Sequence, residues 1–157
     1  MTLEAITTFI RFTDSEDTSI EHFAFQNSTT TSAITYDSKS FDFLPFIYSG
    51  ATKSISGDNI ESSLTFAANE ISIAYAREAR ENFYLVEINT VLMNPTTFVP
   101  SRTLTTEYWI ASGLSYSVDG VQLNLSSSID AVSFVPNKVL LSRTVGALPV
   151  SSRISNA

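Results

Sequence analysis

Most of the chain alternates between apolar and polar residues with a period of two, which is the pattern of β-strands. A hairpin is expected around the polar turn at residues 37–40, and Leu44-Pro45-Phe46 ends it because proline cannot donate to a strand ladder. Asp119-Gly120 is the strongest hairpin signal. The expected strands are residues 7–13, 20–25, 34–36, 41–43, 62–67, 84–93, 105–118 and 121–125.

The strand at residues 84–93 has two alternating sets of side chains. Leu85, Glu87, Asn89, Val91 and Met93 form the more polar set. The other set is more apolar, so we expect it to face the core; its members are Tyr84, Val86, Ile88, Thr90 and Leu92.

Residues 71–83 are the one segment with a convincing helical pattern. Asn69 precedes it as a plausible N-cap, and Glu70 lies where the helix dipole favours a carboxylate. An apolar stripe at helical spacing is expected to contain Tyr75, Ala76, Ala79 and Phe83, flanked by Ile71 and Ile73. The predicted class is therefore mostly β with a minor α component.

The segment after residue 128 is apolar but irregular. Pro136, Gly146 and Pro149 interrupt it, so neither one helix nor one central strand fits. We therefore expect a single domain: a β-barrel or sandwich at residues 1–128, with residues 129–157 as its extended C-terminal arm.

Composition limits the classes of function. The chain has 157 residues, 43% of them apolar, and a net charge of −7; its nine basic residues are scattered, whereas phosphate binding normally needs a basic patch. No apolar run approaches the ~18–20 residues of a membrane span. Residues 1–11 lack the basic start of a secretory signal, so we expect synthesis and folding in a cytosol.

Few residues suit catalysis or metal binding. The absence of cysteine excludes disulfides, iron–sulfur ligation and cysteine zinc sites. The acidic group at residues 14–21 lacks a calcium-loop pattern and is expected to be a solvated turn. His22 is the only histidine, and no G-x-S-x-G elbow accompanies it. We expect no enzyme, no cofactor and no metal; a hydrolase centred on His22 is the weakest alternative.

Two apolar segments are hard to cover with one small sheet and one helix. The first is residues 41–48, and the second follows Ser126. We expect burial between subunits, as in obligate assemblies, with contacts at Phe43, Phe46, Tyr48, Trp109, Phe134, Val135, Leu140 and Leu148. A competing interpretation is a carbohydrate-binding β-sandwich whose aromatic platform combines Trp109, Tyr108 and Tyr116, although core packing or subunit contact is the more usual role of such residues.

A family resemblance is carried by four segments. Phe41-Asp42-Phe43-Leu44-Pro45-Phe46 precedes residues 57–69 (GDNIESSLTFAAN); residues 123–131 (LNLSSSIDA) precede residues 135–140 (VPNKVL). In pattern and order these resemble the N-terminal domain of lambda-like minor tail protein L and related tail-tip or baseplate hub proteins of long-tailed phages. Those proteins continue into a cysteine-rich region associated with an iron–sulfur cluster, which we expect to be absent here.

The resemblance implies a barrel or sandwich related to tail-tube proteins, set in a ring. A homotrimer is favoured by analogy with the hub, and a hexamer is possible by analogy with the tube. The expected function is that of a structural virion protein, made in the host cytoplasm, at the distal end of a phage tail. It would join tail tube to tip, with other tail proteins above and below. Its acidic composition suits a lumen that passes DNA without specific binding.

Overall fold

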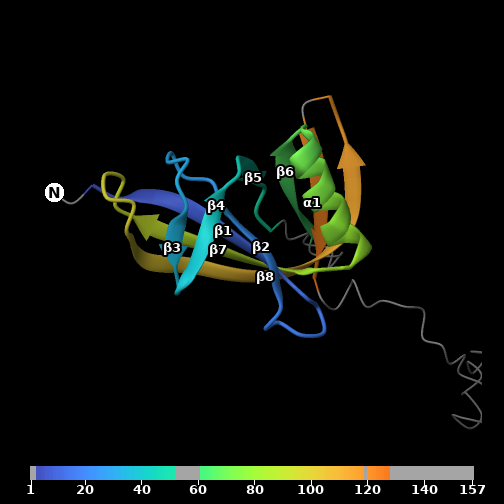
Figure 1. Ribbon diagram of the computed structural model, residues 1–157, viewed down its shortest axis with the longest axis horizontal. Coiled ribbons are helices and arrows are strands. Elements are labelled where there is room, and N and C mark those ends of the chain that lie inside the picture. The colour runs from blue at the N-terminus through green and yellow to red at the C-terminus, as the bar shows by residue number, and fades with distance from the viewer. Residues whose placement is uncertain (1–2, 52–60, 119, 128–157) are drawn as a thin grey trace, which may run out of the picture.

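A computed structural model describes residues 3–51, 61–118 and 120–127 (Figure 1). These residues form nine strands and one helix, so the mostly-β prediction is confirmed. The elements are β1 (Ala5–Thr13), β2 (Glu21–Gln26), β3 (Ile34–Tyr36), β4 (Lys39–Phe43), β5 (Phe46–Tyr48), β6 (Glu61–Ala67), α1 (Glu70–Glu81), β7 (Leu85–Met93), β8 (Pro100–Tyr116) and β9 (Gly120–Ser126). The predicted arm at residues 129–157 lies outside the described residues.

All nine strands belong to one mixed sheet in the order β3-β4-β2-β1-β7-β8-β9-β6-β5. β2 and β4 run parallel, whereas the other neighbouring strands are antiparallel. The 17-residue strand β8 is shared: its first part pairs with β7 and its last part with β9. The long strands β1, β7 and β8 therefore form the spine of the molecule.

The described strands form a sheet that curls but stays open, whereas the sequence predicted a barrel or sandwich. Its outer strands, β3 and β5, are each paired on one side only. The two ends nevertheless approach each other, because only Leu44 and Pro45 separate β4 from β5. The Leu44 amide donates to the Gln26 carbonyl at 3.2 Å, and Asn27 Nδ2 donates to the Phe46 carbonyl at 3.4 Å.

Two apolar cores lie on opposite faces of this sheet. The helix-side core lies between α1 and the curled strands and includes Ile10, Phe12, Val86 and Leu123. The hairpin-side core lies beneath the β3–β4 hairpin and consists of buried Phe9, Ala24, Ile34, Phe41, Val91 and Met93. Because neighbouring strand residues point to opposite faces, β1 supplies Phe9 to one core and Ile10 to the other. Figure 1 shows the hairpin and the helix at opposite ends of the long strands.

This change of face corrects the prediction for residues 84–93. Tyr84, Val86 and Ile88 face the helix-side core as predicted. Beyond Ile88 the covering layer changes to the β3–β4 hairpin on the other face, so Thr90 and Leu92 are only partly buried. The buried side chains there come from the set predicted to face away: Asn89, Val91 and Met93.

The helix begins where its cap predicts. Asn69 Oδ1 accepts a hydrogen bond from the Ser72 amide at 2.8 Å, and Glu70 lies in the first turn. The predicted apolar stripe is only partly correct: Ala76 and Ala79 are buried, and Ile73 and Tyr75 pack against the helix-side core. Phe83 is 50% exposed because the helix ends at Glu81, and Ile71 is 62% exposed. The helix is too short to span a bilayer, and the described residues contain no other.

Candidate functional site

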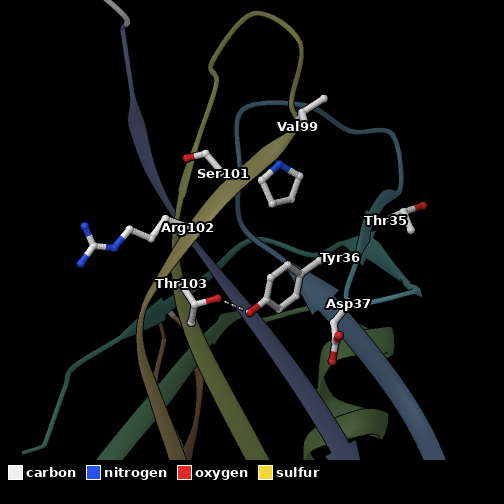
Figure 2. A pocket seen from close by; sticks show the side chains of 8 residues that line it. Thr35, Tyr36, Asp37, Val99, Ser101, Arg102 and Thr103 are labelled. Carbon is white, nitrogen blue, oxygen red and sulfur yellow. Dashed lines mark hydrogen bonds between the residues drawn. The ribbon is translucent and has the colours of Figure 1, made fainter.

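A shallow groove lies between β3 and the start of β8 (Figure 2). Asp37 and Ser38, with φ of 50° and 62°, form the tight turn that returns the chain from β3 to β4. This turn places Tyr36 over the sheet, where its ring stacks on Phe9 at 4.8 Å between centroids. The Tyr36 hydroxyl shares a 2.6 Å hydrogen bond with Thr103 Oγ1, which joins the hairpin to β8.

The groove has a volume of about 310 Å³, and its lining combines the apolar Val99 and Pro100 with residues that carry hydroxyl groups, such as Ser101 and Thr103. Figure 2 shows Arg102 pointing away from Tyr36 and Asp37. Asp37 is the other charged residue of the lining, and it is exposed. Such a lining can donate and accept hydrogen bonds, but it brings no nucleophile and base together.

A polar network lies beside the hairpin-side core. Arg11 Nη2 pairs with Glu87 Oε2, and Glu87 Oε1 accepts from Asn89 Nδ2 at 2.8 Å. Thr106 Oγ1 donates to Asn89 Oδ1 at 2.6 Å, and Asn89 is 4% exposed. Each of these polar groups has a partner, as a folded interior requires. Because the network links β1, β7 and β8 side by side, its role is to hold these strands in register.

A second polar group lies on the opposite face, around Glu107. The Tyr48 hydroxyl donates to Glu107 Oε2, and Trp109 Nε1 donates to the same oxygen at 3.3 Å. Burial, followed by the hydrogen bond to Glu107, raises the pKa of Tyr48 to about 12. The carboxylate of Glu107 thus receives two neutral donors and, in the described part of the chain, no cation.

His22 lies on β2 against Tyr84. The two rings stack at 4.0 Å with an interplanar angle of 8°, and His22 Nε2 is 3.9 Å from Asp14 Oδ2. Asp14 also caps its own turn by accepting from the Glu16 amide at 2.8 Å, as expected of a solvated turn. Within residues 3–51, 61–118 and 120–127, no cluster of three or more potential metal ligands occurs.

The predicted aromatic platform does not form. Trp109 is 5% exposed and belongs to the helix-side core, whereas Tyr108 is 60% exposed on the opposite face. The physical reason is the alternation of side chains along a strand, which separates consecutive residues. Tyr116 is exposed as well, but it lies at the far end of β8. A three-ring sugar platform is therefore excluded for these residues.

The predicted subunit-contact residues separate into three groups. Phe46 and Trp109 are each 5% exposed and belong to the helix-side core, and their contact role stays a prediction. Phe43 and Tyr48 are partly exposed, and Phe43 lines an apolar groove of about 360 Å³ beside β5; their contact role remains a prediction. The remaining four lie outside the described residues: Phe134, Val135, Leu140 and Leu148.

Sequence reasoning missed the most organised polar residues of the molecule. The alternation pattern assigns Glu87 and Asn89 to the solvent face, and it leaves residues 101–104 outside any strand, although they belong to the first part of β8. One sequence signal was available: an acidic residue and an amide residue, Glu87 and Asn89, lie within an otherwise apolar strand. Polar side chains buried in such a strand need hydrogen-bond partners. Arg11 gives no such signal, because 76 residues separate it from Glu87.

No protein-family model matches the chain, and no curated protein matches it.

Proposed function

We propose that this chain is a structural virion protein of the distal phage tail, acting as a baseplate hub or adaptor ring that links tail tube to tip. Its mechanism would be assembly. In this proposal the curled sheet is a relative of the tail-tube barrel, and three or six copies form a ring through which DNA passes. The proposal rests on the family resemblance together with one structural observation.

That observation is the open sheet, whose two outer strands each have an edge that no other described strand pairs with. β3 ends one side of the sheet and β5 ends the other, and Ile47 on β5 is 71% exposed. Unpaired strand edges readily accept another strand. Pairing between β5 of one copy and β3 of the next joins two different surfaces. Such a head-to-tail contact closes into a ring when the rotation between copies permits.

The charge supports the same proposal. A net charge of −7 repels DNA, so a lumen lined by this chain would let DNA pass without holding it. The apolar residues of the segment 129–150 would lock a neighbouring subunit or ring. A high-resolution map of the assembly with mainly Arg and Lys facing the pore would contradict this part of the proposal.

Negative-stain imaging combined with sedimentation velocity tests the assembly. We expect rings with a central pore, and we expect Ile47→Asp to abolish them by placing a charge at the β5 edge. The matched control is Ile71→Asp, which alters a similarly exposed isoleucine on α1 and should leave the rings intact. A compact monomer of the unaltered chain at micromolar concentration would refute the proposal.

A truncation tests the C-terminal segment. Removing residues 129–157 should reduce ring formation and attachment to tails while leaving the unfolding transition of the domain nearly unchanged. If the truncated chain still forms complete rings that join tails, the segment has no role in assembly.

A further inference from the structure

One edge of β8 has no partner among the described strands over more than half of its length. β8 pairs with β7 from Pro100 to Ile110, but with β9 only from Ile110 to Tyr116. Among the described strands, none pairs with the other edge of residues 100–109, and residues 101–106 are exposed. A free inner edge of this length is distinct from the short outer strands β3 and β5.

The side chains along this edge have a defined arrangement. Arg102 is opposite Leu92 and Glu107 is opposite Ile88, so both charged side chains lie on the same face of the sheet. Thr103 and Thr106 are opposite Val91 and Asn89 and lie on the other face. A register shift between Thr90 and Val91 leaves Leu104 as the extra residue of a β-bulge.

We propose that two copies of this chain associate by pairing their β8 edges antiparallel about a twofold axis at Thr105. In this register, with Leu104 bulged out of the pairing, Thr103 lies opposite Thr106 of the second copy. Arg102 lies opposite Glu107 of the second copy, and the contact occurs twice. Residues directly opposite each other in an antiparallel pair point to the same face of the sheet. Both proposed pairs meet this condition, because Arg102 and Glu107 lie on one face and Thr103 and Thr106 lie on the other.

Charge selects this register. In the described part of the chain Arg102 forms no ion pair, and Glu107 receives only the neutral donors of Tyr48 and Trp109. A shift of two paired positions in either direction would place Arg102 opposite Thr105 or Trp109 instead. The bulge and the charges therefore favour the register with Arg102 opposite Glu107 and disfavour the others.

This β8–β8 contact is different from the contacts that would form the proposed ring. A twofold contact cannot close a ring of three or six copies, and it uses β8 rather than β3 and β5. Its presence or absence is independent of whether the chain is a tail protein, so the two proposals can fail separately. A contact of two short strand edges is small, which predicts a weak, concentration-dependent dimer.

Charge reversal tests the pairing in sedimentation velocity. R102E and E107R each place like charges opposite each other, so each should weaken association at least ~10-fold. In a mixed dimer of the two variants, both contacts again join a carboxylate to a guanidinium. An equimolar mixture should therefore restore association to within about threefold of the unaltered chain. R77E, which changes an exposed charge on α1, is the matched control and should have no effect.

A crosslink tests the twofold axis without altering any charge. The chain has no cysteine, so T105C introduces a single thiol that meets its own copy across the axis. Opposed Cα atoms in an antiparallel pair lie within the range that a disulfide spans. Under air oxidation T105C should form a covalent dimer rapidly, whereas S115C, at the β9-paired end of β8, should not. A monomeric unaltered chain, unrestored association in the mixture, or equal crosslinking of both variants would overturn the proposal.

Discussion

The two cores of this sheet differ in size and in how they are covered. Among the described residues, seventeen buried residues form the helix-side core, but only six form the hairpin-side core. Since apolar burial contributes roughly in proportion to area, the helix-side core supplies most of the stability. The hairpin-side core is covered by a single short hairpin, which is anchored through Phe9, Tyr36 and Phe41.

The difference shows how a small open sheet can bury both of its faces. β1 and β7 are each buried on one face near α1 and on the other near the hairpin. Where the covering layer ends, polar side chains take over, as in the network of Arg11, Glu87 and Asn89. The two ends of the long strands should therefore respond differently to the same kind of substitution.

The largest effect is expected from Phe12→Ala in the helix-side core. Phe12 is 1% exposed and lies in the central strand β1. Truncation should lower the free energy of unfolding of the whole domain by about 4 kcal/mol, through lost burial and the cavity left behind. Urea denaturation measures it. Phe83→Ala is the control: Phe83 is half exposed, so its loss should be much smaller.

Phe41→Ala makes the same change in the hairpin-side core. Phe41 is 2% exposed, but it belongs to the covering hairpin rather than to the spine. We expect the substitution to lower the free energy of local opening of the β3–β4 hairpin by about 3 kcal/mol. Hydrogen exchange should show faster exchange of β3 and β4 amides with β7 nearly unchanged. Equal acceleration throughout the sheet would mean that the two cores unfold as one unit.

Gly120→Ala tests how closely the helix-side strands approach. A Cβ at Gly120 would lie 2.4 Å from the carbonyl oxygen of Phe66, so β9 and β6 would have to separate. We expect a destabilisation of about 1–3 kcal/mol. At Gly113 the nearest atom is the Asn124 amide nitrogen at 3.1 Å, the end of a side chain that can move. Gly113→Ala should therefore cost less, and thermal unfolding of both variants compares them.

The smallest effect is a pH dependence that arises at the edge of the helix-side core. Burial, followed by the hydrogen bond to Glu78, raises the pKa of Tyr84 from 10.0 to about 12. The folded state therefore favours the protonated phenol, and this contribution is complete below about pH 10 and lost as the pH rises toward about 12. Tyr84→Phe should make unfolding less dependent on pH in this window. The pKa of Tyr48 is also raised to about 12, so part of the pH dependence should remain in the Tyr84→Phe variant.

Local signals predicted most of the elements. Asn69 marks the start of α1, and Asp119-Gly120 falls at the β8–β9 connection. The short strand β5 was missed because it begins directly after Pro45, in the segment predicted to end the hairpin. The order of the strands and the change of buried face depend on pairing between distant segments, such as Ala5 with Met93, and no local pattern encodes that pairing.

The candidate sites were less predictable than the fold, for two different reasons. The pairing of Arg11 with Glu87 depends on the sheet order, which the sequence does not display. The aromatic platform, in contrast, is excluded by a rule that needs only the sequence: adjacent strand residues such as Tyr108 and Trp109 face opposite ways.

The pairing of β1 with β7 has a consequence for synthesis on the ribosome. Because Ala5 pairs with Met93, this ladder cannot form along its full length until Met93 has been synthesised. At ~5–20 residues per second, about 80 residues take roughly 4–16 s to translate. During that interval β2 is the neighbour of β1 that has already emerged. The apolar residues Phe9, Ile10 and Phe12 thus spend seconds without their final cover, the period in which a nascent-chain chaperone would engage this protein.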